Sequence, residues 1–270
     1  MSMNFCSLAS GSSGNCQYVS SETTHLLVDA GLSGKYIRNA LENIDVDPEV
    51  IHGILISHEH SDHVKGVGVL MRRYGVKLYV NELTWKAMKH RVGEVDDNNI
   101  VFFKTNEKFM IGDIEVKPFS ISHDAADPVG FSFCIETAKV CVATDLGIAS
   151  DDILSEIGDC DLLMIEANHD EEMLKMGKYP YYLKRRILGE DGHISNEYAG
   201  GLVVEAARRG RVNQVLLGHL SKENNFPELA YETVRQVVED NNIEVGIDLN
   251  IDMTYRDRVS RLYKIKRILD

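Results

Sequence analysis

The chain has 270 residues, of which 44% are hydrophobic and 26% charged, and its formal net charge is −13. This composition is ordinary for a soluble globular protein, and we expect a single domain over residues 1–270. No apolar stretch is long enough to span a membrane, and the first fifteen residues lack the pattern of a secretion signal. The five cysteines form no C-x-x-C pair, which is typical of free thiols in a reducing compartment. We therefore predict a cytoplasmic protein without a membrane partner.

The negative charge argues against a broad basic face of the kind that binds nucleic acid. Bound divalent cations would offset part of that charge at a site. Basic residues do cluster at 184–186, 208–211 and 256–267. Such clusters are more often solvated surface than a groove for a polyanion, so we first interpret each as solvated surface.

The first hundred residues predict short strands with helices between them. Apolar runs indicate strands at 4–9, 17–20, 25–29, 51–56 and 77–80. Ser33 is expected to cap a helix whose inward face carries Ile37, Ala40, Leu41 and Ile44. Further helices are expected at 63–74 and 83–90.

The middle of the chain is rich in strands, and the last third alternates helices with strands. A hairpin is expected from 108–111 and 114–120 around Gly112-Asp113. The remaining strands are predicted at 130–136, 139–143, 161–166, 213–217, 243–248 and 260–265. Helices are predicted at 151–157, 181–188, 196–209 and 228–240. This order predicts an α/β fold in which helices cover the outer faces of the sheets.

Polar side chains stand where six of the apolar strand runs end. These residues are Asp29, His58, His123, Asp145, Glu166 and His219. Strand ends are rigid and meet at one edge of a sheet, so a site assembled there would use residues in these places. A chain that only needs to fold does not require them.

The densest of these positions is the motif HEHSDH at residues 58–63. In an extended segment, residues two apart point the same way, so His58 and His60 can reach one cation. If the chain then turns into a helix, Asp62 and His63 point to a neighbouring position. Two cations about 3.5–4 Å apart suit hydrolytic displacement, so the motif predicts a dinuclear site.

Such a site needs further ligands, including a bridging carboxylate. His123, Asp145 and His219 are the candidates, because they end other strands. Taken alone, either histidine would be interpreted as structural and Asp145 as a helix cap. Taken with the motif, all three are predicted to be ligands.

The motif HEHSDH, followed by these three residues, resembles the metallo-β-lactamase-fold hydrolases. The resemblance implies a four-layer αββα sandwich with the site at one edge of the two sheets. It also implies that Asp29 orients the site. It implies that one cation is held by His58, His60 and His123 and the other by Asp62, His63 and His219, with Asp145 bridging the two.

Four further stretches concern a phosphate. The loop SGSSGN at residues 10–15 could offer backbone N–H groups to a phosphate, although a plain hairpin turn is an equal interpretation. The candidates in that loop are Ser12, Ser13, Gly14 and Asn15. The stretches IEAN, GHISN and LGHLS resemble the nucleic-acid-processing branch that includes the tRNA 3′-end nucleases. There Glu166 would orient His193 on the scissile phosphate, with Ser195 and Ser221 near that phosphate.

The stretches SLASGSSGN, VDAG, HEHSDH, ATDLG, EANHD, GHISNE and LGHLSKENN, in this order, are similar to the YycJ (WalJ) family. That resemblance implies a DNA exonuclease of 5′-to-3′ polarity that uses manganese. The chain has no β-CASP insertion between Asp145 and His219 and no long arm of the tRNA-nuclease kind. Both features disfavour RNA processing.

The expected reaction is phosphodiester hydrolysis with two divalent cations. Manganese or zinc would suit imidazole and carboxylate ligands, and iron is a third choice. A water shared by the cations would ionise near neutral pH, and Asp62 would orient it and take its proton. His193 would donate to the phosphate or to the leaving oxygen.

Other functions on the same residues stay open. A small-molecule phosphodiesterase acting on a cyclic phosphate or nucleotide is favoured by the acidic charge. A thioesterase would not need Glu166, His193 or Ser221, and a non-catalytic protein would not need an intact ligand set. His169 in EANHD is interpreted equally well as a surface residue at the start of a helix or as a substrate contact.

Overall fold

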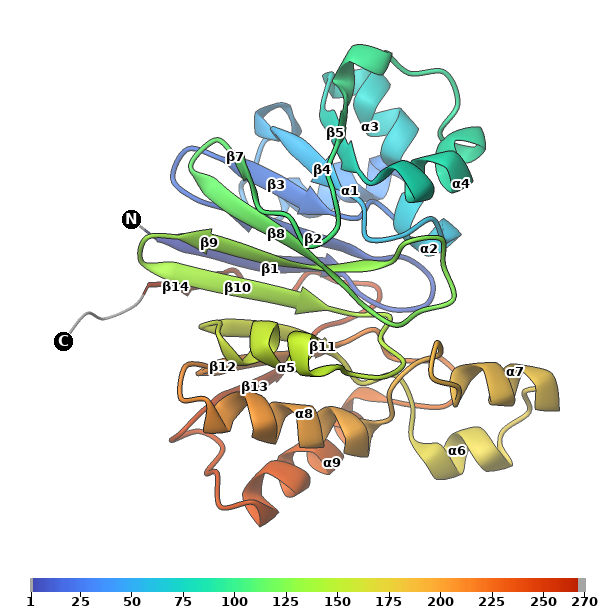
Figure 1. The fold of residues 1–270 in the computed structure, drawn as a ribbon, viewed down its shortest axis with the longest axis vertical. Coiled ribbons are helices and arrows are strands. Elements are labelled where there is room, and N and C mark those ends of the chain that lie inside the picture. The colour runs from blue at the N-terminus through green and yellow to red at the C-terminus, as the bar shows by residue number, and fades with distance from the viewer. Residues whose placement is uncertain (1, 267–270) are drawn as a thin grey trace.

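The computed structural model describes residues 2–266 and contains two seven-stranded sheets stacked face to face, with helices on both outer faces (Figure 1). The predicted four-layer αββα arrangement is confirmed. None of the helices in residues 2–266 combines the length and the apolar character that crossing a membrane would need.

The first sheet is parallel from β3 to β6 and antiparallel elsewhere. Its strands run in the order β14 (Tyr263–Ile265), β1 (Met3–Ala9), β2 (Cys16–Ser20), β3 (His25–Val28), β4 (Gly53–Leu55), β5 (Lys77–Val80) and β6 (Ile100–Phe102). Its outer face is covered by α1 (Gly34–Glu42), α3 (Val67–Tyr74) and α4 (Glu82–Val92). Ser33 caps α1 by accepting from the N–H of Tyr36, as predicted.

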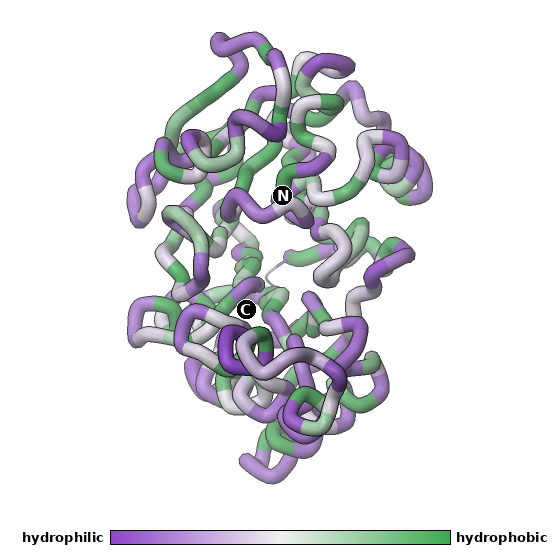
Figure 2. The backbone as a smooth tube through the Cα atoms, turned by 90° about the vertical axis from the view of Figure 1, so that its right-hand side faces the viewer, coloured by the Kyte–Doolittle hydropathy of each residue, from purple (hydrophilic) through white to green (hydrophobic). Residues whose placement is uncertain are grey.

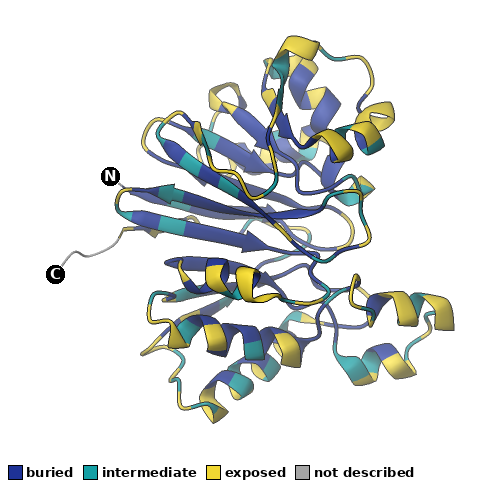
Figure 3. Cartoon of the chain, in the orientation of Figure 1, coloured by how far each residue is buried: buried dark blue, intermediate teal, exposed yellow. Residues whose placement is uncertain are grey.

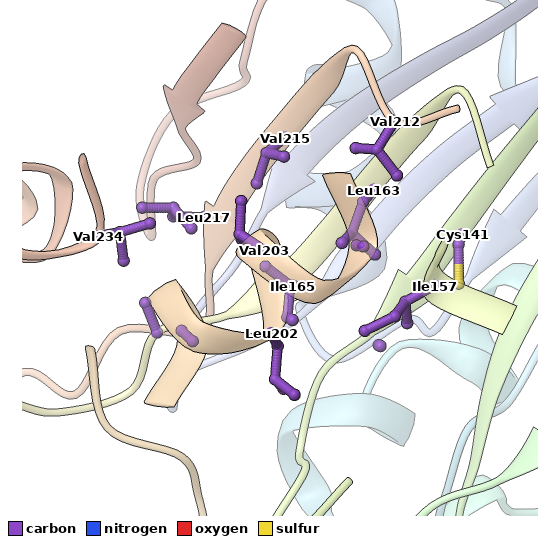
Figure 4. Close-up of a cluster of buried hydrophobic side chains, with 14 of the residues drawn as sticks. Cys141, Ile157, Leu163, Ile165, Leu202, Val203, Val212, Val215, Leu217 and Val234 are labelled. Carbon is purple, nitrogen blue, oxygen red and sulfur yellow. The ribbon is translucent and has the colours of Figure 1, made fainter. Parts of the chain in front are cut away.

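The second sheet is parallel from β10 to β13 and antiparallel elsewhere. Its strands run in the order β13 (Asn250–Met253), β12 (Gln214–Gly218), β11 (Leu162–Glu166), β10 (Ala138–Ala143), β9 (Val129–Ile135), β8 (Ile114–Ser120) and β7 (Phe109–Ile111). Its outer face is covered by α5 (Asp151–Gly158), α8 (Asn196–Arg208) and α9 (Pro227–Asp240). Figure 4 shows side chains of this helix layer, such as Leu202 and Val203, meeting Ile165 and Leu217 of the sheet.

The space between the two sheets is filled by apolar side chains from both. Phe5 of β1 and Phe131 and Phe133 of β9 are among the largest fully buried side chains. Burying a large aromatic side chain contributes about 1.5–3 kcal/mol, so this layer contributes strongly to stability. Figure 3 shows the strands almost entirely buried, and Figure 2 shows hydrophilic residues recurring along the chain at both ends of the long axis.

The structure differs from the sequence predictions in four places. The helix expected at 63–74 is two helices, α2 (Ser61–Val64) and α3, because the N–H of Gly66 donates to the carbonyl of Ala30 at 2.7 Å. The strand expected at 243–248 is wrong: this segment is a turn containing Gly246 at φ 93°, and the strand begins at Asn250. Strand β6 was not predicted, and Ile44 lies beyond the end of α1.

Candidate metal centre

Polar residues from both sheets meet at the edge where strands β3, β4, β8, β10, β11 and β12 end. In the parallel pairs these strands end level with one another, since Val28 pairs with Leu55 and Glu166 pairs with Gly218. Two short helices lie on the same side of the molecule as α2 (Figure 1): α6 (Glu171–Met176) and α7 (Tyr181–Ile187). The predicted gathering of strand-end residues at one edge is confirmed.

Three of these residues leave their strands through left-handed backbone. The φ angles are 61° at Asp29, 59° at Asp145 and 53° at His219. Such conformations cost about 1–3 kcal/mol at a non-glycine residue and persist where the surroundings enforce them. They turn each side chain out of the strand direction and toward the edge. Strain at three strand ends that face one another is typical of a functional site.

The first group of ligating atoms consists of three imidazole nitrogens. His58 Nε2 lies 3.0 Å from His60 Nδ1, and His123 Nε2 lies 3.3 Å from the same atom. Two nitrogens bound to one ion at about 2.0–2.1 Å in tetrahedral geometry would be about 3.3 Å apart. The spacing therefore fits one cation held by these three residues.

The second group lies next to the first and includes a carboxylate. His63 Nε2 is 3.5 Å from Asp62 Oδ2, and His219 Nε2 is 3.8 Å from that oxygen. The ligating atoms of the three residues lie within 4.8 Å of one another. The structure thus brings together the second set of residues that the sequence predicted.

Asp145 stands between the two groups. Its Oδ2 is 3.4 Å from His63 Nε2, and its Oδ1 is 3.8 Å from His123 Nε2. Asp145 Oδ2 and His219 Nε2 are buried and have no hydrogen-bonding partner in residues 2–266. Buried polar atoms without partners are costly, and a bound cation would satisfy both. The residues present therefore fit a pair of divalent cations.

The far nitrogen of four of the five histidines is held by a neighbouring acceptor. These pairs are His58 Nδ1 with Ser57 Oγ (3.0 Å), His63 Nδ1 with Asp29 Oδ2 (2.7 Å), His123 Nδ1 with the carbonyl of Gly192 (3.2 Å) and His219 Nδ1 with Glu166 Oε1 (3.1 Å). A proton on Nδ1 leaves the Nε2 lone pair free for a metal. Asp29 also accepts from the N–H and hydroxyl of Ser57, so it contacts both ends of the HEHSDH region, at Ser57 and at His63.

Burial lowers the pKa of these histidines, and neighbouring charges add to this effect at His58 but oppose it at His63 and His219. Burial and the neighbouring histidines hold the pKa of His58 well below its usual value, so it stays neutral. Burial also opposes protonation of His63, but Asp145, Asp29 and Asp62 outweigh it and raise its pKa well above the usual value. For His219 the same balance, led by Asp145 after burial, raises the pKa to about 10. The carboxylates therefore create a strong demand for positive charge at the second group, which a divalent cation would meet.

Glu166 and His193 form a pair beside both groups. Glu166 Oε1 accepts from His193 Nδ1 at 2.7 Å, and Glu166 Oε2 accepts from the N–H of Leu146 at 2.8 Å. Glu166 is fully buried, whereas the His193 side chain is partly exposed. Burial raises the pKa of Glu166, but His193 and His219 outweigh it and leave the carboxyl ionised. Glu166 therefore lies within hydrogen-bonding distance of two histidines, His193 and His219, whereas the sequence predicted only its pairing with His193.

The SGSSGN loop is tied to the histidine motif. Ser12 and Ser13 are exposed, whereas Gly14 and Asn15 are buried. The Asn15 N–H donates to the carbonyl of Asp62 at 2.8 Å, and Asn15 Nδ2 lies 3.1 Å from His63 Nε2. Asn15 thus contacts a candidate ligand directly, which the sequence did not indicate. Contact of the loop with a phosphate stays a prediction.

Three serines near the site already accept hydrogen bonds. Ser195 Oγ caps α8 by accepting from the N–H of Tyr198, and Ser221 Oγ accepts from the N–H of Asn224. Ser10 Oγ accepts from the N–H of His219 at 2.8 Å, across 209 positions of the chain. Each hydroxyl keeps its own proton for donation, so the predicted phosphate contacts of Ser195 and Ser221 are compatible with these roles.

His169 is not a surface residue, so that interpretation is wrong. Its side chain is 1% exposed, and neither ring nitrogen has a hydrogen-bonding partner among residues 2–266. Its neighbour Asp170, not His169, caps α6. Burial lowers the pKa of His169 to about 4, so it is neutral at pH 7.

Comparison with known proteins relates this site to others. A family model described as "Beta-lactamase superfamily domain" matches residues 24–220. The chain is 42% identical to an exodeoxyribonuclease YycJ of Bacillus anthracis, over 91% of this chain and 93% of the relative. It is also 42% identical to an exodeoxyribonuclease WalJ of Streptococcus pneumoniae, over 96% of both chains. Among solved structures, the metallo-β-lactamase-fold protein YhfI of Bacillus subtilis superimposes with a TM-score of 0.71 at 15% identity, covering 98% of this chain and 100% of that one.

Proposed function

The chain belongs to the metallo-β-lactamase superfamily and, within it, to the family of the exodeoxyribonucleases YycJ and WalJ, and on that premise we propose that it is a metal-dependent exonuclease that degrades DNA in the 5′-to-3′ direction. Support for DNA as substrate comes from the names of these relatives. The observation that carries the hydrolytic chemistry is the pair of adjacent ligand groups joined by Asp145.

The first cation would be held by His58, His60 and His123, and the second by Asp62, His63 and His219, with Asp145 shared. Two divalent cations, manganese or zinc, would supply Lewis acidity and a shared hydroxide that forms near neutral pH. The chain's own residues would do the rest. Asp62 is the candidate to orient the nucleophile and take its proton, because its carboxylate belongs to the second group and is partly exposed.

His193 would contact the scissile phosphate or protonate the leaving oxygen. Its Nδ1 is held by Glu166, so its Nε2 is the atom that can face a substrate. Its ring centre lies 5.1 Å from that of His123 and 5.4 Å from that of His219, which places it beside both ligand groups. The exposed Ser12 and Ser13 and the loop backbone would bind a phosphate.

The test compares wild type with Asp62→Ala on a long 5′-phosphorylated DNA duplex with added manganese. One duplex carries a label near its 5′ end and another a label near its 3′ end. We expect wild type to release the 5′ label first and Asp62→Ala to release neither. The exposed Asp240→Ala, at the end of α9, is the matched control and should behave as wild type.

A second substrate, bis-p-nitrophenyl phosphate, separates this proposal from its rival. A small-molecule phosphodiesterase is favoured by the net charge of −13, which would repel a polyanion. Cleavage of the small diester without DNA degradation would overturn the exonuclease proposal and support the rival. Release of the 3′ label first would overturn the polarity alone.

A further inference from the structure

Residues 175–188, here called the basic-aromatic segment, carry a local excess of positive charge. They comprise the end of α6, the connection and α7. Their five basic residues are Lys175, Lys178, Lys184, Arg185 and Arg186, and they contain no acidic residue. A local charge of +5 within a chain of net charge −13 is a strong asymmetry. It marks a place where a polyanion would be attracted.

The same segment exposes large aromatic rings. Tyr181 and Tyr182, in the first turn of α7, are each 75% exposed, and Met176 before them is 85% exposed. The guanidinium of Arg185 lies over the Tyr181 ring, 6.0 Å from its centre. Figure 3 shows exposed residues along both α6 and α7. Flat rings next to cations on a rigid helix form a stacking platform.

The segment is joined to the candidate metal centre. The N–H of His193 donates to the carbonyl of Ile187, the last residue of α7, at 2.9 Å. Arg186 forms an ion pair with Asp124, whose Oδ1 lies 4.0 Å from His60 Nε2. Tyr181 is six residues before Ile187, or about 9 Å along the helix axis. That length corresponds to about three stacked nucleotides at 3.4 Å each.

The basic cluster at 208–211 has a different environment. Arg208 pairs with Glu205, and Arg211 pairs with Asp159 and Asp161. In the basic-aromatic segment, Lys178 and Arg185 are exposed, with no ion pair to another described residue. Lys175 pairs with Glu171 and Glu172, and Arg186 pairs with Asp124, so Lys178 and Arg185 are the cations of the segment that are most available to a partner.

We propose that the basic-aromatic segment binds single-stranded DNA beside the metal centre. Tyr181 and Tyr182 stack on unpaired bases, and Lys178 and Arg185 contact phosphates. The occupant is a single strand because the faces of bases are accessible to tyrosine only where the duplex is open. This inference rests on the proposed exonuclease function. It adds that the DNA bound beside the metal centre is single-stranded.

The test measures binding of a fluorescent oligothymidylate by anisotropy at several salt concentrations, with a chelator present to prevent cleavage. Tyr181→Ala/Tyr182→Ala removes two stacking rings and should raise Kd by at least about 30-fold, and Tyr181→Phe/Tyr182→Phe should keep binding because phenylalanine also stacks. Lys178→Ala/Arg185→Ala should reduce the slope of log K against log salt by about 1.4, or about 0.7 for each phosphate contact.

Two matched controls test whether position matters. Lys104→Ala/Lys108→Ala removes two exposed cations from the turn before β7, and Phe102→Ala removes a half-exposed ring from β6. Both should bind oligothymidylate as wild type does. If the segment variants match these controls while wild type degrades DNA, the inference fails and the exonuclease proposal stands. If the segment variants lose duplex and single-strand binding equally, the single-strand assignment is overturned.

Activity of the manganese-loaded enzyme gives an independent measurement. At low substrate concentration, the tyrosine variant should lose at least about five times more activity on single-stranded DNA than on bis-p-nitrophenyl phosphate, since one lost stacked base corresponds to about that factor. Equal losses on both substrates would refute the inference, because they would indicate damage to the metal centre. Wild-type cleavage of the small diester alone would instead refute the exonuclease proposal.

Discussion

Replacing Glu166 by glutamine tests whether this buried carboxylate fixes the histidine tautomers. Glu166 accepts three hydrogen bonds, from His193 Nδ1, from His219 Nδ1 and from the N–H of Leu146. Glutamine has nearly the same shape but presents one NH₂ group. If that group faces Leu146, two donors oppose each other. If it faces the histidines, Nδ1 must lose its proton and Nε2 must carry it, which blocks the His219 nitrogen aimed at the second cation.

The size of the expected loss in Glu166→Gln follows from the number of hydrogen bonds that become unsatisfied. Either orientation leaves one buried donor unsatisfied, at a cost of about 1–3 kcal/mol. That range corresponds to roughly a 5- to 150-fold change in an equilibrium constant and overlaps the about 10–100-fold loss typical when such an outer partner is removed. We expect Glu166→Gln to weaken metal binding and lower DNA hydrolysis by about 10–100-fold.

The assay is metal affinity by chelator competition, with DNA hydrolysis measured at saturating manganese. The control is Glu156→Gln, the same chemical change on α5, where the carboxylate pairs with Lys117 and Lys139. It should lower the melting temperature but leave metal affinity unchanged. A Glu166→Gln protein whose metal affinity and activity stay within about twofold of wild type would refute the tautomer argument, because that change is below the cost of one buried donor.

Three further predictions concern stability. His169 has a pKa of about 4 when folded, against about 6.5 unfolded, so at this position the unfolded chain binds more protons below pH 6.5. In urea titrations of metal-free protein, the free energy of unfolding of wild type should fall by about 3 kcal/mol more than that of His169→Phe between pH 6.5 and 4. Gly31→Ala would place a Cβ 1.5 Å from the carbonyl oxygen of Asp62, and we expect loss of metal binding together with a lower melting temperature; normal metal content would contradict this. Phe131→Ala, between the sheets, should cost about 3–5 kcal/mol in urea unfolding without shifting metal affinity in the folded protein.

Most elements could be predicted because their signals are local. Ser33 caps α1 because a short hydroxyl side chain in extended backbone can accept from an N–H three residues on. The strand-end positions of His58 and Asp145 follow from apolar runs that stop abruptly. The spacing of the HEHSDH motif then brings its side chains to one place for simple geometric reasons.

The errors arose where distant contacts or a turn outweighed the local pattern. Ile243, Val245 and Ile247 alternate as in a strand, yet Ile247 is 74% exposed and Asp248 Oδ2 accepts from the N–H of Glu244 to close a turn. The break at Gly66 depends on a carbonyl 36 positions earlier in the chain. A local sequence pattern around Gly66 does not reveal that Ala30 is its hydrogen-bonding partner or that the two residues lie close together.

Many of the contacts around the site also could not be predicted from the sequence. The acceptor for His123 Nδ1 is the carbonyl of Gly192, a group that every residue carries and no motif distinguishes. The bond from the His219 N–H to Ser10 Oγ joins opposite ends of the chain. Residue types could therefore suggest which side chains ligate, but not what orients them.

The candidate ligands are divided between the two sheets, so each proposed cation would be a reversible cross-link between them. Each group takes two ligands from the segment after β4 in the first sheet and one, His123 or His219, from the second. The chain itself passes between the sheets at two places, after β6 and between β13 and β14. A protein cut near Asn106, in the first of these connections, should therefore reassemble from its two fragments more tightly when manganese or zinc is supplied, which would make fragment complementation a direct measure of metal occupancy.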